Sequence, residues 1–497
     1  MNKVNQKVAI VALSAIIGGG ALLPFQVHAA SLAPVAQIQK AAITNFQFQQ
    51  DKSIQHLIDK DVLQGYSDGK VRSEKIVTNA ELIKMILLAL EVDTVDSNTA
   101  VQGAKWYDAY LSSALAHGLI DNVEKLAPNH ATTSSDMASL IAKALQRDVK
   151  SVQHWMNGLS IGSESITRGE TAMLLVQAEQ AIRSENAEIT SIKALNKIAF
   201  EVTFNAPLSQ ADEAMAAASA NFVFDGDIKL VNQPRLKTGS IATYIVPVQT
   251  MKEGTTYTLN YKGKQNLSVA ASDELIQLNA VSQVTADTFE INSLRSNNVI
   301  DYGYVISAYA GGRGGNAAVL DENNKLDGQL MQVIPSLATR QAVLTPQGGE
   351  PLTVSYVGFT QSTDGKQEPK FRLPQGTTLQ PGQKYTVSSN WFNVKEASFV
   401  AETIAPLGIA SVEAVNETTL SVSLTQDPGD ELFAYRSIQL KGSDGSSLTA
   451  QYKVQTRKGA VGVFELQNNG KLALGITYEI MPVGTWAKAD KISLTTK

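Results

Sequence analysis

The sequence predicts a multidomain protein with a helical front third and an all-β rear two-thirds. Between residues 51 and 182, apolar residues recur at three- and four-residue spacing, which is typical of helices that bury one face. After Glu185 the spacing falls to two, and Ile198–Phe204 alternates apolar and polar residues as a half-buried strand does. Similar strand openings and closings then recur along the chain, which indicates several β domains in a row.

Residues 1–30 have the features of a secretory signal peptide. Two lysines precede an uncharged run over residues 8–23, and small residues follow at the expected cleavage positions, Ala29 or Ala30. No later segment has the roughly 18 apolar residues needed to span a bilayer. We therefore expect a secreted protein without a membrane span, and the remaining 467 or so residues suffice for roughly three to five domains.

The composition excludes several kinds of site. The chain has no cysteine, and its net charge of −5 becomes about −7 once the two lysines of the signal peptide are removed, so nucleic-acid binding is not expected. All five histidines lie before residue 155. A Ser-His-Asp triad, a Cys-His pair and a His-ligated zinc site are therefore excluded from the larger part of the chain.

The helical front third contains an internal repeat. Three helices are each expected to begin with a threonine that is followed three residues later by an acidic residue, an N-capping pattern. These starts are Thr78–Glu81, Thr133–Asp136 and Thr167–Glu170. A shorter helix precedes each one, at Ile54–Asp59, Trp106–His117 and Val152–Met156.

The third helix start places an arginine, Arg168, inside the cap. The first turn of a helix carries partial positive charge and unpaired N–H groups, so it favours an anion. Arg168 adds nothing to such a helix, but it could join the free N–H groups in holding an external anion. The alternative is a simple solvated charge, and Thr167 and Glu170 cap the helix in either case.

The motifs VLQGYSDG with IVTNAELIKMIL, KWYDAYLSSALAHGLI and SITRGETAMLL resemble three S-layer homology (SLH) repeats, the wall-anchoring modules of Gram-positive surface proteins. The resemblance covers about 130 of the 497 residues. It implies an N-terminal all-α SLH three-repeat bundle over residues 31–185. It also implies that grooves between the repeats bind a pyruvylated secondary cell-wall polysaccharide, whose carboxylate suits an arginine beside a helix N-terminus.

Residue by residue, the resemblance implies a polysaccharide site made from the third helix start, the Gly-Tyr-x-Asp-Gly loop and one tryptophan. The implied residues are Arg168, Thr167, Gly169, Tyr66, Asp68, Gly69 and Trp106. Asp68 and Gly69 could instead only shape a turn, and Trp106 could be buried between helices. Asn79 and Ser134 stand where the family has its basic residue, so one fully competent groove is expected.

Behind residue 185, repeated closings with Gly-x-x-Tyr resemble the tyrosine-corner position of Ig-like sandwiches. The tyrosines concerned are Tyr257, Tyr385 and Tyr478. We expect three all-β Ig-like sandwiches, over residues 186–272, 273–405 and 406–497. The middle one carries an insertion at about residues 294–345.

The insertion holds two unusual segments, a glycine cluster at 311–315 and the polar run 321–328. Neither fits a phosphate loop, a dinucleotide fingerprint or a calcium EF-hand, so both are interpreted as flexible surface loops. Elsewhere, Asp427, Asp430 and Glu431 could share a structural calcium ion, although a solvated acidic turn is the simpler interpretation. No other cofactor is expected.

These patterns favour a structural protein of the cell wall or S-layer over two alternatives. The first alternative is a wall-anchored adhesin or ligand-binding protein that uses the insertion of the middle β domain. The second is a glycosidase, which needs only two carboxylates, but no β domain is large enough for a typical catalytic cleft. The expected partners are wall polysaccharide and, in a lattice, further copies of the chain. We expect no enzyme activity.

Overall fold

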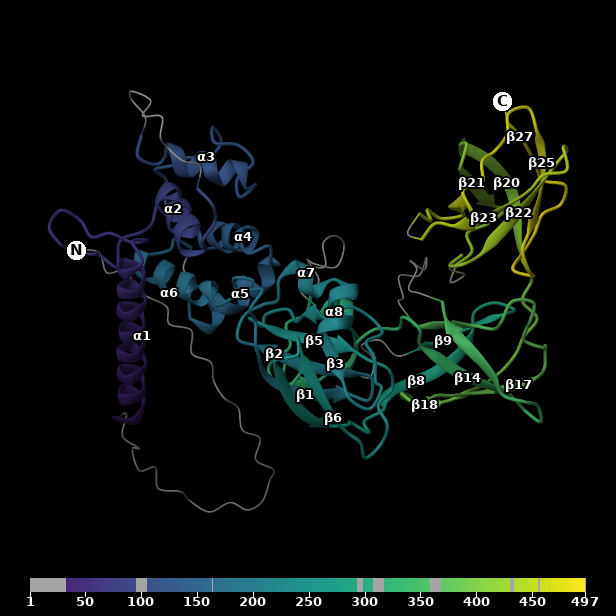
Figure 1. Ribbon diagram of the computed structural model, residues 1–497, viewed down its shortest axis with the longest axis horizontal. Coiled ribbons are helices and arrows are strands. Elements are labelled where there is room, and N and C mark those ends of the chain that lie inside the picture. The colour runs from purple at the N-terminus through teal and green to yellow at the C-terminus, as the bar shows by residue number, and fades with distance from the viewer. Residues whose placement is uncertain are drawn as a thin grey trace, which may run out of the picture.

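The computed structural model describes residues 33–94, 105–162, 164–292, 298–306, 317–357, 368–429, 433–454 and 456–496 (Figure 1). The predicted signal peptide and the glycine cluster at 311–315 lie outside the described residues. No helix in the described part of the chain is both long and apolar enough to cross a membrane.

The described part of the front region holds six helices around one hydrophobic core. They are α1 (Ala33–Asp59), α2 (Asn79–Ala89), α3 (Asp108–Ala116), α4 (Ser134–Ala144), α5 (Val149–Gly158) and α6 (Arg168–Glu179). Thr78, Thr133 and Thr167 cap α2, α4 and α6 as predicted, and each threonine side chain accepts from the backbone N–H three residues later.

The three helix starts are joined by a closed ring of backbone hydrogen bonds. Val77 N donates to the Ile166 carbonyl, Ile166 N to the Thr132 carbonyl, and Thr132 N to the Val77 carbonyl. All three residues are fully buried, and antiparallel β-bridges link the residues that flank them. The segments before α2, α4 and α6 therefore meet at one point, although they are far apart in the sequence.

The predicted fold class is wrong for the N-terminal part. An all-α SLH three-repeat bundle is not seen, because β-bridges between the helix starts form the central contact. The described chain as a whole is mainly β, with 27 strands against eight α-helices. Helical periodicity predicted the helices themselves, but it carries no information on how the segments between them pair.

The first β region has two sheets and two short helices. One sheet has the order β1-β2-β5-β4 and the other β3-β6-β7. The strands are β1 (Ile189–Asn196), β2 (Ala199–Phe204), β3 (Phe222–Phe224), β4 (Arg235–Leu236), β5 (Thr243–Pro247), β6 (Thr256–Tyr261) and β7 (Gln265–Ala270), and the helices are α7 (Gln210–Glu213) and α8 (Met215–Asn221). Five of the six β2 residues are buried, so this strand is more deeply buried than its alternating pattern predicted.

The second β region is one eight-stranded sheet with the order β18-β8-β9-β16-β15-β14-β17-β19. Its strands are β8 (Ile276–Gln283), β9 (Thr288–Asn292), β14 (Gln341–Pro346), β15 (Leu352–Tyr356), β16 (Lys370–Arg372), β17 (Lys384–Ser388), β18 (Phe392–Glu396) and β19 (Ser398–Val400). The predicted insertion adds β10 (Val299–Asp301), the 3-10 helix η1 (Tyr302–Tyr304), β11 (Lys325–Leu326), β12 (Gln329–Leu330) and β13 (Gln332–Ile334).

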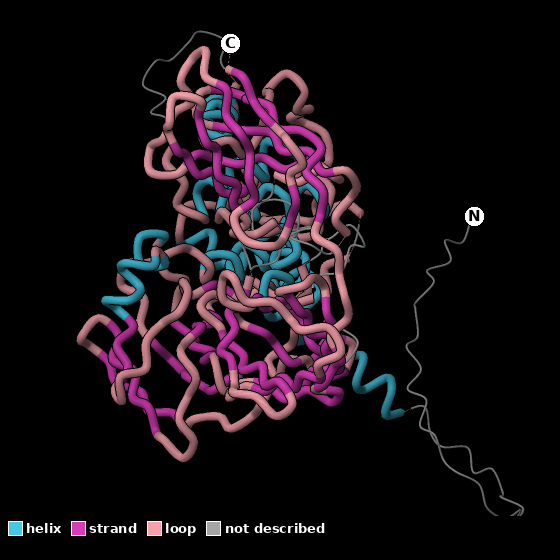
Figure 2. Tube along the Cα trace, turned by 90° about the vertical axis from the view of Figure 1, so that its right-hand side faces the viewer, coloured by secondary structure: helices cyan, strands magenta, loops and turns pink. Residues whose placement is uncertain are grey.

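The third β region repeats this arrangement, with the order β26-β20-β21-β24-β23-β22-β25-β27. Its strands are β20 (Leu407–Asn416), β21 (Thr419–Leu424), β22 (Ser437–Gly442), β23 (Ser447–Tyr452), β24 (Val461–Leu466), β25 (Thr477–Pro482), β26 (Ala487–Lys488) and β27 (Ser493–Thr495). Figure 2 shows these strands near the C-terminus as a group apart from the other strands. The β-rich rear is therefore confirmed, although its first region also contains α7 and α8 and each of the other two regions has a single eight-stranded sheet as its main sheet.

The three predicted corner tyrosines behave alike. The hydroxyls of Tyr257, Tyr385 and Tyr478 each accept a hydrogen bond from the backbone N–H five residues upstream, at 2.9, 2.9 and 3.0 Å. All three side chains are buried. The tyrosine corner that the Gly-x-x-Tyr closings predicted is therefore confirmed in every β region.

Candidate functional site around Tyr66

The loop before α2 is a tight turn that presents Tyr66. Tyr66 N donates to the Lys70 carbonyl at 2.9 Å and Gly69 N to the Tyr66 carbonyl at 2.8 Å. Gly69 has φ +76°, a conformation that glycine adopts without steric cost. The Asp68 carboxylate accepts from Lys70 N, so Asp68 and Gly69 shape the turn.

Three cationic side chains surround the Tyr66 ring. The Arg72 guanidinium lies 4.2 Å from the ring centroid, Lys75 Nζ 5.1 Å and the Arg168 guanidinium 5.2 Å. These distances fall within the range of cation–π attraction. We call Tyr66, Arg72, Lys75 and Arg168, with the carboxylates that pair with them, the Tyr66 cluster.

Two carboxylates, Asp68 and Glu81, balance part of this charge. Arg72 pairs with Asp68 at 3.0 Å, and Glu81 pairs with Lys75 at 3.6 Å and with Arg168 at 3.5 Å. The pKa of Lys75 is raised, first by the nearby Tyr66 hydroxyl and, against some desolvation, by the charge of Glu81. Three cations against two carboxylates leave the cluster with one surplus positive charge.

Arg168 differs from the prediction, because its guanidinium is internal. Its side chain is only 8% exposed, Nη2 donates to the Gln64 carbonyl at 2.8 Å, and Nη1 faces Glu81. Its Nε is buried and has no hydrogen-bond partner among the described residues. A buried donor without a partner is unfavourable, so this atom is the one feature of Arg168 that points to a further ligand.

The helix terminus also differs from the prediction, since its N–H groups are occupied. Arg168 N donates to the Lys75 carbonyl, Gly169 N to the Ser73 carbonyl, and Glu170 N to the Thr167 hydroxyl. The start of α6 therefore offers no free N–H group at these positions to an external anion. The expected anion receptor, built from a helix N-terminus and Arg168 together, does not match this geometry.

Of the remaining implied residues, Thr167 and Gly169 have structural roles, and Trp106 lies elsewhere in the front region. Thr167 caps α6, and Gly169 leaves room for α1, because a Cβ there would lie 2.1 Å from the Gln50 side chain and would force that side chain to move. Trp106 lies before α3, is 56% exposed, and contacts Tyr107 edge to face. The structure thus brings Tyr66, Asp68 and Arg168 together, whereas none of the contacts described for Trp106 involves them.

The equivalent helix starts show what Arg168 adds. Asn79, at the same position of α2, donates through Nδ2 to the Ala127 carbonyl at 3.0 Å, as Arg168 does to Gln64. Asn79 N likewise donates to His130 and Ser134 N to Glu164. At the start of α2 an uncharged amide therefore makes the contact that Arg168 makes at the start of α6. The charge of Arg168 is additional to that contact.

Sequence reasoning missed Arg72, Lys75 and Glu81. Lys75 and Glu81 meet Arg168 only because the hydrogen-bond ring brings the segment before α2 against the start of α6. No sequence pattern reports that pairing. Arg72 lies six residues beyond Tyr66, and a basic residue so close to the aromatic loop is the one local sequence signal for the cluster.

The described residues give no support for a metal site. In the ranges that the structure describes, no group of three or more His, Cys, Asp or Glu side chains could hold a metal ion. Asp427 pairs with Arg457 at 3.0 Å, and the other two residues of the considered calcium site, Asp430 and Glu431, lie outside the described residues.

Comparisons with known proteins give little beyond this geometry. No protein-family model and no curated protein matches the chain. Among solved structures, the S-layer protein rSbsC(31-844) is 12% identical over 91% of this chain and 73% of its own, with a TM-score of 0.16. The N-terminal part of the bacterial S-layer protein SbsC is 13% identical over 76% and 81%, with a TM-score of 0.19.

An L,D-transpeptidase from Mycobacterium smegmatis is 12% identical over 43% of this chain and 89% of its own, with a TM-score of 0.15. All three TM-scores are far below the level that indicates a shared fold. These similarities therefore carry no argument about family or function, and the functional case rests on the Tyr66 cluster.

Proposed function

We propose that the chain is a structural protein of the cell surface, held on the wall through the front region, where the Tyr66 cluster binds an anionic wall polysaccharide. The observation that supports this is the one surplus positive charge of the Tyr66 cluster. Arg168 contributes a charge there, whereas the equivalent residue of α2, Asn79, makes the same contact with an uncharged amide. The proposal assigns neither catalysis nor a cofactor to the chain.

The proposed contacts differ from those that the sequence alone suggested. Arg72 and Lys75 are 45% and 43% exposed, so they present the charge to solvent, while buried Arg168 supports Tyr66 from behind. A carboxylate of the ligand, such as that of a pyruvylated sugar, would replace Asp68 as the partner of Arg72 and Glu81 as the partner of Lys75.

The test compares two double variants of the mature protein in binding to cell-wall sacculi. R72Q/K75Q removes the two exposed cations. K453Q/K471Q is the matched control, because those lysines are 52% and 63% exposed and are also ion-paired, but lie in the third β region. A hydrogen bond to a charged group contributes about 1.5–3 kcal/mol, so R72Q/K75Q should bind at least about tenfold more weakly.

Removing pyruvyl groups from the sacculi should weaken the wild-type protein to a similar extent and leave R72Q/K75Q unchanged. Equal binding by both double variants would contradict the assignment to the Tyr66 cluster. We further propose that the β regions assemble with further copies of the chain into an ordered sheet, which negative-stain microscopy of the purified protein tests.

A further inference from the structure

The first β region and the insertion of the second meet around a buried carboxylate, Glu201, on β2. Its side chain is 1% exposed. Lys237 Nζ lies 2.9 Å from Glu201 Oε1, and Lys193 Nζ lies 2.6 Å from Oε2. The Lys237 side chain is itself only 5% exposed, whereas that of Lys193 is about half exposed.

An asparagine of the insertion completes this cluster. Lys237 Nζ donates to Asn324 Oδ1 at 2.6 Å, and Asn324 Nδ2 donates to Glu201 Oε2 at 3.4 Å. Asn324 is 8% exposed. The carbonyl carbon is bonded to Oδ1 at about 1.2 Å, so the amine lies within about 4 Å of that carbon.

We propose that Lys237 and Asn324 form an intramolecular isopeptide bond, with Glu201 as the proton-transfer group. In this step the Lys237 ammonium gives a proton to Glu201, and the free amine attacks the Asn324 carboxamide carbon. A new C–N bond forms between Nζ and Cγ. The Cγ–Nδ2 bond breaks, Nδ2 takes up the proton held by Glu201, and the nitrogen leaves as ammonia. The second proton that Nζ loses as the amide forms departs with the ammonia as ammonium, so Glu201 is again a carboxylate. Nothing is oxidised or reduced, and no co-reactant is needed.

Charge balance favours the bonded state. Before the reaction Glu201 faces two ammonium groups, the buried one of Lys237 and the half-exposed one of Lys193. An amide between Lys237 and Asn324 is uncharged, and the ammonium of Lys193 then balances Glu201 alone. The bond thus replaces the buried ammonium of Lys237, which is costly to desolvate, by a neutral amide.

Both reacting side chains are held in place by their backbones. Lys237 N donates to the Thr243 carbonyl, and Lys237 forms a β-bridge with Ile306 of the insertion. Asn324 has φ +60°, donates from its backbone N to the Asp321 carbonyl, and accepts from Met331 N at its own carbonyl. Such fixed geometry is what raises the effective concentration of one reactant toward the other.

The polar turn that holds Asn324 is a shaped element and not the flexible loop that the sequence suggested. Asp321 Oδ1 accepts from Asn323 N at 2.9 Å and from Lys325 N at 2.8 Å. These hydrogen bonds, that to Lys325 N first, lower the pKa of Asp321. The turn is thus ordered around the asparagine, whose side chain faces inward to the first β region.

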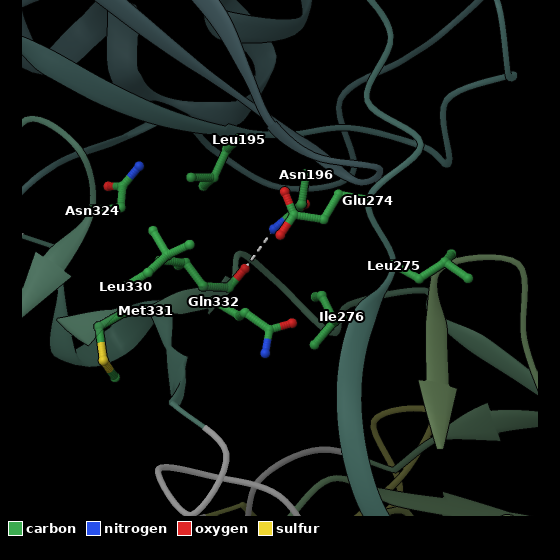
Figure 3. A pocket seen from close by; sticks show the side chains of 10 residues that line it. Leu195, Asn196, Glu274, Leu275, Ile276, Asn324, Leu330, Met331 and Gln332 are labelled. Atoms are coloured by element: carbon green, nitrogen blue, oxygen red, sulfur yellow. Dashed lines mark hydrogen bonds between the residues drawn. The ribbon is translucent and has the colours of Figure 1, made fainter. Parts of the chain in front are cut away.

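Apolar surroundings and a small cavity suit the reaction. Ala199, Ile245, Ile300, Val305, Ile306, Leu320, Met331 and Val333 form a hydrophobic cluster between the two regions. Figure 3 shows Asn324 at the edge of an adjacent pocket, together with Leu195, Asn196 and Leu330. Its volume of about 60 Å³ exceeds the roughly 15 Å³ that one water-sized molecule needs, so ammonia can leave Nδ2 into it.

The experiment is mass spectrometry of the full-length secreted protein after proteolysis under denaturing conditions. The wild-type chain should yield one branched peptide that joins Lys237 to Asn324, lighter than the two sequence peptides together by one ammonia molecule. On a denaturing gel the intact chain should migrate faster than an unlinked one, because the bond closes a loop between residues 87 apart. Recovery of separate, unmodified Lys237 and Asn324 peptides from folded wild-type protein would overturn the proposal.

Variants assign the roles. N324A should abolish the branched peptide, whereas N323A, which alters the exposed neighbour, should leave it complete. E201Q keeps the size of the side chain but cannot accept the proton, so bond formation should slow by about 10²–10⁴-fold, the usual contribution of a general acid–base. Unchanged bond formation in E201Q would overturn the role of Glu201. If E201Q fails to fold, the wild-type peptide map still decides whether the bond exists.

Discussion

The two junctions between the β regions are built from different interactions. The first junction, between the first and second β regions, buries the hydrophobic cluster around Ile245 and Val333 and the ion cluster around Glu201. The second junction, between the second and third β regions, has an apolar cluster of only two described residues, Val357 and Ala434. Its main contact is an ion pair.

Polar contacts show the same contrast. At the first junction, buried Arg340 donates through Nη2 to the Val248 carbonyl at 2.8 Å and to the Ile198 carbonyl at 3.2 Å, and through Nε to the Ser336 carbonyl. At the second junction, Arg436 donates through Nη1 and Nη2 to the two carboxylate oxygens of Asp287, at 2.6 and 2.8 Å.

A cavity of about 190 Å³ lies beside the second contact, lined by the 404–407 linker and Trp486. Apolar burial resists bending more than one ion pair does, so we expect a stiff first junction and a hinged second one.

The front region belongs to the stiff part. Arg147, before α5, donates to the Ser240 and Ile241 carbonyls, and Trp155 Nε1 donates to the Gly239 carbonyl at 2.8 Å. A Cβ on Gly239 would lie 2.5 Å from Val319 of the insertion and 3.2 Å from His154. The loop around Gly239 is therefore where the front region, the first β region and the insertion meet.

The largest effect is expected from R340A at the first junction. Burial lowers the pKa of Arg340 to about 10, so the guanidinium remains charged at neutral pH. Its removal leaves three buried carbonyl oxygens without this donor and should cost about 3 kcal/mol of unfolding free energy. Urea unfolding measures the loss, with K384A, at an exposed position of β17, as the control. A loss no larger than that of the control would mean that the first junction does not depend on Arg340.

At the second junction we expect a smaller, pH-dependent effect from D287N. Burial of the Asp287 carboxyl acts to raise its pKa. Hydrogen bonds and charge from Arg436, followed by the charge of Arg372, outweigh this effect and lower the pKa of Asp287 to about 2. A lowered carboxyl pKa stabilises the folded state above the unfolded value near 3.8, and this stability is lost as pH falls through about 2. The pKa difference corresponds to about 2 kcal/mol.

Small-angle scattering from pH 5 to pH 2 should therefore show the wild-type protein extending as the third β region separates from the second. D287N should already be extended at pH 5 and should change little. A wild-type chain with the same dimensions at both ends of this range would contradict a hinge that depends on Asp287.

The junctions also show which features of the fold can be predicted from the sequence. Local patterns predicted the caps at Thr78, Thr133 and Thr167, the β-rich rear and the three corner tyrosines, because each depends on residues within a few positions of one another. The ring that joins the helix starts, and the meeting of Lys237 with Asn324, depend on pairings between distant segments. Periodicity carries no signal for these, so the all-α bundle was expected and the polar turn at 321–328 was interpreted as flexible.

The same limit applies to the Tyr66 cluster. A tyrosine in a tight loop and an arginine at a helix start were both evident from the sequence. Their contact, and the exposure of Arg72 and Lys75 instead of Arg168, follow from the segments that the ring brings together. Burial of an arginine is decided by its neighbours in three dimensions, which the local sequence does not specify.

The smallest expected effect is also the sharpest test of the two junctions, because it uses the same substitution on both sides of the hinge. Y257F and Y478F each remove a buried hydroxyl that accepts one backbone N–H, at 2.9 and 3.0 Å, and each should lower the free energy of unfolding by about 1 kcal/mol.

Scanning calorimetry should show two transitions in the wild-type protein if the second junction couples its neighbours weakly. Y478F should then lower only the transition of the third β region. Y257F should lower the other transition as a whole, because the first junction ties the first β region to the front region and the insertion. A single transition that both variants shift equally would show that the second junction is as strongly coupled as the first.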